Sequence, residues 1–135
     1  MSERPRVLVV DDNKKLLEIA VAVLSRDFEI VGAVTDGRAA LEAAVTLQPD
    51  VIVLDITMPD VCGLEVARRL KAAGSQAAVV FLTVHDDEEI VRAARDAGGV
   101  GYVLKPRLGS DLRRVAVGAV TGHRFVSLGM PDGLW

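Results

Sequence analysis

Short apolar runs and longer amphipathic segments alternate five times along this chain, and this alternation constrains the fold more than any other feature. The runs are rich in Val, Ile and Leu, and most are continuous, which is typical of strands buried on both faces. They lie at residues 7–10, 30–34, 51–54, 78–82 and 102–104. The segments between and after them repeat apolar residues at the spacing of a helix face.

Parallel strands need crossover connections, usually helices, so the alternation predicts an α/β fold with helices on both faces of the sheet. Five strand–helix units are too few for an eight-stranded barrel. We therefore expect a doubly wound (βα)5 domain whose five-stranded parallel sheet has the order 2-1-3-4-5. The length of 135 residues fits a single domain over residues 1–122 and a short tail at 123–135.

Turn and capping residues agree with these elements. Gly74 and Gly98 follow the third and fourth helical segments, where a glycine commonly ends a helix. Asp86 or Asp87 is expected to cap the fourth helix, and Ser110 the fifth.

Composition excludes several classes of protein. The net charge of −3 disfavours a broad basic surface, so we expect no direct nucleic-acid binding, and we interpret Arg107, Arg113 and Arg114 as a solvated helix face. The single cysteine, Cys62, rules out an intramolecular disulfide. The longest apolar run, residues 77–82, is far shorter than a membrane span, and the N-terminal run is too short for a signal peptide. We expect a cytoplasmic protein without membrane contact.

Polar residues end four of the predicted strands. Asp11 and Asp12 end the first, Asp55 the third, Thr83 the fourth and Lys105 the fifth. In an open α/β sheet, ligands bind at the carboxyl ends of the strands, where the strand order reverses. The predicted order places that point between strands one and three, so these side chains should converge on one edge.

Three close carboxylates need a cation to stay ionised together, and Mg²⁺ or Mn²⁺ prefers such oxygen ligands. A lysine and a threonine beside that centre suit a phosphoryl group, because they supply charge and a hydrogen bond to its oxygens. No glycine-rich phosphate loop follows the first strand, which argues against nucleotide binding.

These residues lie within longer stretches that carry a family resemblance: VLVVDDN, DVIVLDITMPDVCGLEVARRL, VVFLTVHDD and GYVLKP. Their sequence and order resemble the receiver domains of two-component response regulators, which have the chemotaxis-regulator-like fold. The resemblance covers residues 6 to about 122. FLTVHDDEEIVRAARDAG and TGHRFVS are most similar to receivers of NarL/LuxR-type transcription regulators, which normally continue into a helix-turn-helix domain. We therefore expect a stand-alone receiver or an excised one.

The resemblance implies a role for each acidic residue. Asp55 would be the phosphoacceptor and would attack the phosphorus of a phosphohistidine on a sensor histidine kinase or a phosphotransfer protein. Asp12, Asp55 and the backbone carbonyl of Thr57 would bind the Mg²⁺ directly, and Asp11 would act on the metal through water. The chain would catalyse only its own phosphorylation and dephosphorylation and would not be an enzyme in the usual sense.

The resemblance also implies a switch. Lys105 would pair with a phosphoryl oxygen, Thr83 would move to hydrogen-bond the phosphoryl group, and Tyr102 would swing inward behind it. The Lys105–Pro106 peptide bond is commonly cis in this family. Helix four, strand five and helix five would form the output face, through which a homodimer could assemble.

Some positions depart from the family pattern or leave its consequences open. Cys62 stands in a turn where a polar residue is frequent. Val84 is bulkier than the alanine or serine common after the switch threonine, which could restrict access to the site. Thr57 and His85 occupy positions that tune the dephosphorylation rate in the family.

Simpler interpretations stand beside these roles. Asp11 and Asp12 could cap the first helix, Tyr102 could be a packing residue, and His85 an exposed loop residue. Two other functions are also considered. A phosphorylation-independent pseudo-receiver, acting as a protein-interaction module, should have lost the acidic site. An aspartyl-phosphate phosphohydrolase would carry a D-x-D-x-T/V motif on the first strand, and residues 9–12 do not provide this motif.

Overall fold

The structure, a computed structural model, describes residues 4–123 and 125–126 of the 135-residue chain. The strands are β1 (Arg6–Val10), β2 (Glu29–Val34), β3 (Val51–Leu54), β4 (Ala78–Thr83), β5 (Gly101–Leu104) and β6 (Phe125–Val126). The helices are α1 (Lys14–Leu24), α2 (Gly37–Leu47), α3 (Gly63–Ala72), α4 (Glu88–Asp96) and α5 (Leu108–Val120). A 3₁₀ turn, η1 (Lys105–Arg107), joins β5 to α5.

The first five strands form a parallel sheet in the order β2-β1-β3-β4-β5, which confirms the predicted doubly wound fold. β1 and β3 lie inside the sheet, and their apolar side chains at residues 7–10 and 51–54 are fully buried. This burial on both faces is the physical reason for their unbroken apolar sequences. β6, which the sequence pattern did not predict, adds a sixth parallel strand beyond β5.

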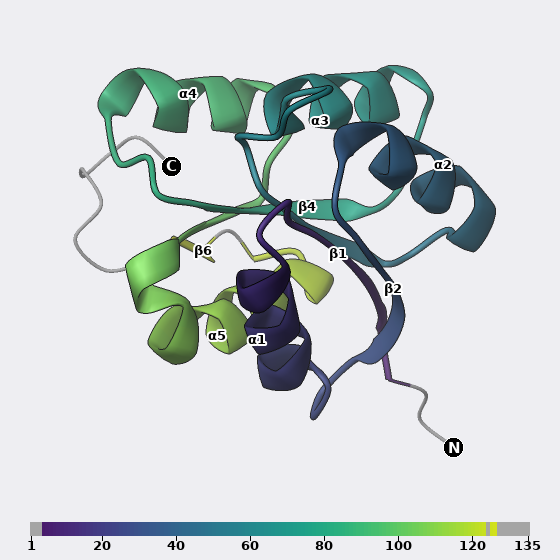
Figure 1. Ribbon diagram of the computed structural model, residues 1–135, viewed down its shortest axis with the longest axis vertical. Coiled ribbons are helices and arrows are strands. Elements are labelled where there is room, and N and C mark those ends of the chain that lie inside the picture. The colour runs from purple at the N-terminus through teal and green to yellow at the C-terminus, as the bar shows by residue number, and fades with distance from the viewer. Residues whose placement is uncertain (1–3, 124, 127–135) are drawn as a thin grey trace.

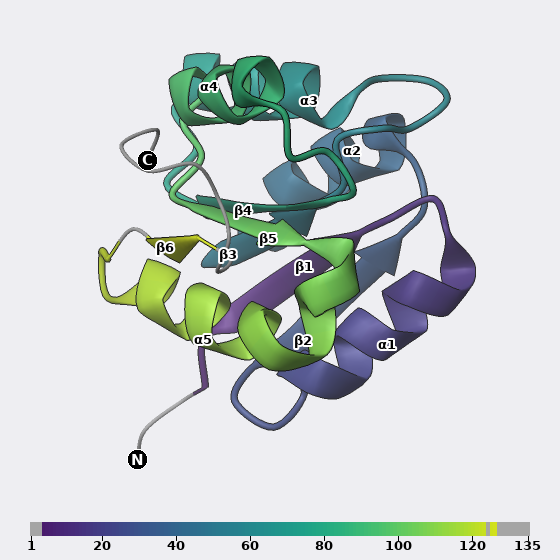
Figure 2. The same ribbon diagram turned by 90° about the vertical axis from the view of Figure 1, so that its left-hand side faces the viewer.

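Helices cover both faces of the sheet (Figure 1). α1 and α5 lie on one face, and α2, α3 and α4 on the other, as the view turned by 90° also shows (Figure 2). Each layer has its own core, because alternate strand residues point to opposite faces. Phe28 and Leu112 belong to the α1–α5 side, whereas Phe81 and Tyr102 belong to the other side.

Helix ends follow most of the predicted signals. Gly74 and Gly98 have φ values of +80° and +99° after α3 and α4, which glycine adopts without strain. Asp87 takes the N-cap position of α4, as predicted, but its side chain makes no capping hydrogen bond. The prediction that Ser110 caps α5 is wrong, because η1 passes directly into the helix and Arg107 takes the N-cap position.

The expected tail is described only in part. His123, Phe125 and Val126 are within the described residues, and the others in 123–135, including Trp135, lie outside them. Since Phe125 and Val126 pair with β5, part of this segment belongs to the sheet. The boundary between a domain at 1–122 and a tail stays a prediction. Within the described residues, no helix has the length and apolar character needed to cross a membrane.

Candidate functional site at the carboxyl ends of the strands

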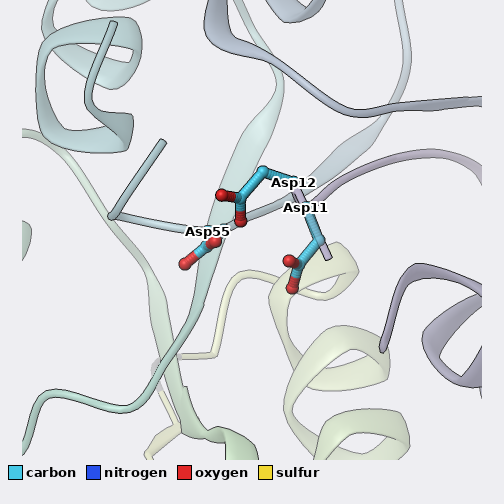
Figure 3. Close-up of side chains that lie close together, drawn as sticks. All are labelled: Asp11, Asp12 and Asp55. Carbon is cyan, nitrogen blue, oxygen red and sulfur yellow. The ribbon is translucent and has the colours of Figure 1, made fainter. Parts of the chain in front are cut away.

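Three aspartates meet where β1 and β3 end (Figure 3). Asp11 and Asp12 follow the last residue of β1, and Asp55 follows the last residue of β3. Because β1 and β3 are parallel neighbours, their ends reach the same edge of the sheet. One carboxylate oxygen from each of the three residues lies within 4.8 Å of the others. The predicted convergence of the carboxylates is confirmed.

The aspartates differ in exposure and in partners. Asp11 and Asp55 are buried, with 0% and 2% of their surface exposed, whereas Asp12 faces solvent. Oδ1 of Asp11 accepts a hydrogen bond of 2.9 Å from the backbone N–H of Asn13. Oδ2 of Asp11 is buried and accepts no hydrogen bond within the described part of the chain. It lies 3.1 Å from the Lys105 ammonium, an ion pair whose geometry does not make a hydrogen bond.

The N-cap residue of α1 is Asn13, not Asp11 or Asp12. The Asn13 side chain accepts a hydrogen bond from the Leu16 N–H at 3.1 Å and is the N-cap of α1. The capping role is therefore already filled by the next residue. The carboxylates of Asp11 and Asp12 stand with Asp55 instead.

Lys105 extends from the end of β5 into this cluster. Its ammonium nitrogen lies 3.1 Å from Oδ2 of Asp11 and 3.3 Å from Oδ2 of Asp55. The lysine side chain is only 12% exposed, so these ion pairs are largely shielded from water. One cation thus bridges two buried carboxylates.

Asp55 has the most altered titration in the site. Burial raises the pKa of its carboxyl, and the negative charge of Asp11 raises it further, although Lys105 opposes the change; the resulting pKa is about 7. Three carboxylates with a single lysine therefore carry an excess of negative charge in the folded protein. A hard divalent cation would relieve this repulsion, and the all-oxygen donor set suits Mg²⁺ or Mn²⁺.

The loop after β3 is held tightly against Asp55. The Thr57 N–H donates to Oδ1 of Asp55 at 3.3 Å, and the Gly63 N–H donates to the Ile56 carbonyl at 2.7 Å. A Cβ atom at Gly63 would lie 2.0 Å from the Asp55 carbonyl oxygen. Only a glycine permits this close approach, which fixes the backbone from which Asp55 projects.

Asp60 ties the same loop to the first turn of α2. Its two carboxylate oxygens accept hydrogen bonds from the N–H groups of Gly37 and Arg38, each at 2.9 Å. These bonds lower the pKa of Asp60 to about 2. Asp60 was not among the predicted site residues, and the signal that could have found it is an aspartate in a Pro-Asp turn.

Thr83 and Tyr102 connect to the site through His85. Thr83 is buried at the end of β4, and its hydroxyl accepts from the His85 N–H at 3.3 Å. The Tyr102 hydroxyl donates to the His85 carbonyl at 2.7 Å, and the tyrosine is fully buried. Burial raises the pKa of Tyr102, with the charges of nearby aspartates adding to it. Tyr102 therefore already occupies an inward position.

His85 is more than an exposed loop residue. Its ring nitrogen Nε2 lies 2.9 Å from the Thr57 hydroxyl, which joins the loop after β4 to the loop after β3. Val84, immediately before it, is 64% exposed at the same edge. The histidine thus contacts, through separate atoms, Thr57 after β3, Thr83 at the end of β4 and Tyr102 in β5.

The loop that carries Lys105 differs from expectation in one respect. The Lys105–Pro106 peptide bond is trans, because no cis bond occurs among the described residues. A trans bond suits this loop, since Pro106 lies inside the η1 turn, which continues straight into α5. Arg107, at the end of that turn, donates two hydrogen bonds to the buried carboxylate of Asp111, at 2.7 and 3.2 Å.

The helix arginines are exposed in part but are not a purely solvated face. Arg107 and Arg114 approach Asp111, and Arg113 pairs with Asp27 at the end of the α1–β2 connection. The Arg107–Asp111 spacing of four residues is the sequence signal that could have shown the pairing.

Comparison with known proteins gives this arrangement its family. The sequence model of the response regulator receiver domain family matches residues 7–116 of this chain. The chain belongs to this family. Receivers of the family bind Mg²⁺ in an acidic pocket, and Asp11, Asp12 and Asp55 form such a pocket here. They are not enzymes in the usual sense, and they interact with histidine kinases or phosphotransfer proteins.

Two curated relatives are 34% identical to this receiver. One is a nitrate/nitrite response regulator protein homolog of Haemophilus influenzae, with 89% of this chain and 61% of the relative covered. The other is the transcriptional regulatory protein PdtaR of Mycobacterium tuberculosis, with 91% and 60% covered. The chain thus spans about three-fifths of the length of these relatives.

Solved structures agree with the family and with the NarL/LuxR resemblance. The signal receiver domain of the response regulator NarL from Mycobacterium tuberculosis has a TM-score of 0.87 at 31% identity, with 90% of this chain and 100% of that chain covered. A LuxR-family two-component response regulator from Aurantimonas has a TM-score of 0.88 at 25% identity, with 93% and 91% covered.

Proposed function

We propose that this receiver is a phosphorylation-dependent switch whose phosphoacceptor is Asp55. The observation that carries the proposal is the meeting of Asp11, Asp12 and Asp55 within 4.8 Å, with the Lys105 ammonium 3.3 Å from Asp55. Three carboxylates and one ammonium, with Asp11, Asp55 and Lys105 largely shielded from water and Asp12 facing solvent, suit the capture of a phosphoryl group together with a divalent cation.

The phosphoryl donor would be a phosphohistidine of a sensor histidine kinase or a phosphotransfer protein. An oxygen of the Asp55 carboxylate forms a bond to phosphorus, and the phosphorus–nitrogen bond of the donor breaks. The electron pair of that bond stays on the imidazole nitrogen, which then takes up a proton. The product is an acyl phosphate on Asp55, and the donor histidine is regenerated.

The chain's own residues would orient this transfer. Asp12, Asp55 and the Thr57 carbonyl would hold the Mg²⁺ directly, and Asp11 would act through water. The bound cation would neutralise charge on the phosphoryl oxygens. Lys105 would pair with one phosphoryl oxygen, and Thr83 would donate a hydrogen bond to another. Because His85 contacts both Thr83 and Tyr102, a movement of Thr83 would change the contacts of Tyr102.

The alternative, a pseudo-receiver that works without phosphorylation, requires loss of the acidic site. The three aspartates, Thr83 and Lys105 are all present, which favours the phosphoacceptor. Homodimerisation through α4, β5 and α5 and a cytoplasmic location stay predictions of the family resemblance and of the composition. An output such as the transcriptional regulation named for a relative would need residues outside this receiver.

The proposal is tested by intact-mass spectrometry after incubation with acetyl phosphate. The wild-type chain should gain one phosphoryl group in the presence of Mg²⁺ and none with the metal chelated. Asp55→Asn should gain none under either condition. Equal labelling of the variant and the wild type would refute Asp55 as the acceptor.

A further inference from the structure

The strand β6 pairs directly with the switch tyrosine. Phe125 and Val126 lie parallel to Gly101 and Tyr102, and the register places Val126 opposite Tyr102. β6 is the outermost strand of the sheet, beside β5 and close to α5 (Figure 2). Residues 125–126 thus pair with the strand of the residue whose position is proposed to report phosphorylation.

Two further contacts hold β6 in place. The half-buried Val126 side chain packs against the hydrophobic cluster to which Tyr102 belongs. The Val126 carbonyl accepts a hydrogen bond of 3.2 Å from Nη2 of Arg114 on α5. A parallel strand of only two residues gains little from its own pairing, so its docking depends on these neighbours.

Arg114 also links β6 to the loop that carries Lys105. Its Nη2 atom lies 3.8 Å from Oδ1 of Asp111, whose side chain is 3% exposed. The same carboxylate is held by two hydrogen bonds from Arg107, the last residue of η1. η1 begins at Lys105, which contacts Asp55. A connection through the Lys105–Asp55 ion pair, the backbone of η1, Asp111 and Arg114 therefore leads from the acidic site to β6.

A second connection runs through Tyr102 itself. Its hydroxyl donates to the carbonyl of His85, and the N–H of His85 donates to the hydroxyl of Thr83. A movement of Thr83 toward a phosphoryl group on Asp55 would break or redirect the bond from His85, and the change would reach Tyr102 and the strand paired with it.

From these contacts we propose that docking of β6 on β5 and the inward position of Tyr102 form one two-state element that phosphorylation of Asp55 stabilises. The inference rests on the proposed function. In this account β6 is the segment through which the state of the site reaches the C-terminal side of the chain. Linkage makes the effect reciprocal, so a docked β6 also strengthens binding of a phosphoryl mimic at Asp55.

The test is amide hydrogen exchange of Phe125 and Val126, measured by NMR on the full chain with Mg²⁺, before and after addition of beryllofluoride. Beryllofluoride serves as the phosphoryl mimic. Exchange at the β6 amide that pairs with β5 should slow by about fivefold or more, because a short edge strand opens easily and binding of the phosphoryl mimic would hold it closed.

Two variants and a matched control separate coupling from packing. Arg114→Met keeps the aliphatic stem but cannot donate to Val126; it should speed exchange at β6 and weaken beryllofluoride affinity. Arg113→Met, on the same helix but paired with Asp27, is the matched control and should change neither. Tyr102→Phe keeps the ring and removes the bond to His85, so the response of β6 to beryllofluoride should be lost or much reduced.

The outcomes are distinguishable. A response at the amides of residues 55–57 without any change at β6 would overturn this inference alone, as would an Arg114→Met chain with wild-type beryllofluoride affinity. No response at residues 55–57 would overturn the proposed function and this inference with it.

Discussion

At the scale of single residues, Asp55 combines burial, two neighbouring acids and one ammonium partner. Burial and the charge of Asp11 raise its pKa from the ordinary value of 3.8 to about 7. The metal-free protein therefore holds a proton there over a range in which the unfolded chain has released it. Since the folded state binds more protons across this range, the contribution of Asp55 to stability falls as the pH rises from about 4 to 7.

The fall in stability with rising pH leads to the first prediction, which concerns Asp55→Asn. Asparagine cannot ionise, so in the metal-free protein the variant should be more stable than the wild type at pH 8, by about 1 to 3 kcal/mol. The difference should shrink toward zero at about pH 3, below the ordinary pKa of 3.8, where Asp55 is protonated in both states. Urea unfolding in the presence of a chelator measures it. A difference that is the same at both pH values would contradict the raised pKa.

Lys105 gives a second prediction at this scale. Lys105→Ala removes the ammonium next to Asp55 but none of the three carboxylates, so Mg²⁺ should still bind. Phosphorylation by acetyl phosphate should slow by roughly 100-fold, the usual effect of losing one group that stabilises the transition state. Lys14→Ala, on the exposed first turn of α1, is the control and should label at the wild-type rate. Loss of Mg²⁺ binding in Lys105→Ala would show that the lysine has a different role.

At the scale of elements, the start of α3 is fixed by contact with the end of β3. A methyl group at Gly63 would meet the Asp55 carbonyl oxygen at 2.0 Å, so Gly63→Ala must displace the backbone of the acceptor. We predict a loss of stability of about 2 to 4 kcal/mol and at least a tenfold slower phosphorylation. Intact mass and urea unfolding measure the two effects.

Gly109 provides the contrast for that substitution. It lies in α5 with no atom near an added Cβ, so Gly109→Ala should stabilise the protein by about 0.5 to 1 kcal/mol and leave phosphorylation unchanged. If the two glycine variants behaved alike, the contact between Gly63 and Asp55 would not control the site.

The two hydrogen bonds between Asp60 and the start of α2 lead to a fourth prediction. Asp60→Ala removes both hydrogen bonds to the first turn of the helix, so its Tm should be lower than that of the wild type. The loop that carries Thr57 should also loosen, which amide exchange at Thr57 would report. Glu42→Ala, on the exposed face of α2, is the control. Unchanged exchange at Thr57 would mean that Asp60 stabilises α2 but not the loop that carries Thr57.

The elements also show what the sequence could and could not predict. The five main strands were predictable because strands buried on both faces need continuous apolar residues. β6 was not, since two residues after a turn carry no periodicity and are held by partners distant in sequence, Tyr102 and Arg114. The start of α5 was misplaced at Ser110 because the η1 turn has no capping signal of its own.

At the scale of the whole molecule, the site follows from topology. Once the strand order is known, the residues after β1, β3 and β5 must share an edge, so Asp11, Asp55 and Lys105 could be placed together from sequence. Side-chain hydrogen bonds to backbone, such as those of Asp60 with α2 and of the Tyr102 hydroxyl with the His85 carbonyl, could not be predicted, because their partners depend on the paths of the loops.

The central claim is that the phosphoryl group resides on Asp55, and the most direct measurement identifies the modified residue chemically. Borohydride reduces an acyl phosphate to an alcohol and so converts the phosphorylated aspartate to homoserine. After phosphorylation with acetyl phosphate and Mg²⁺, reduction and peptide sequencing by mass spectrometry should place homoserine at position 55 and leave Asp11 and Asp12 unchanged. Homoserine at position 11 or 12, or a phosphorylated chain with aspartate retained at position 55, would contradict the account.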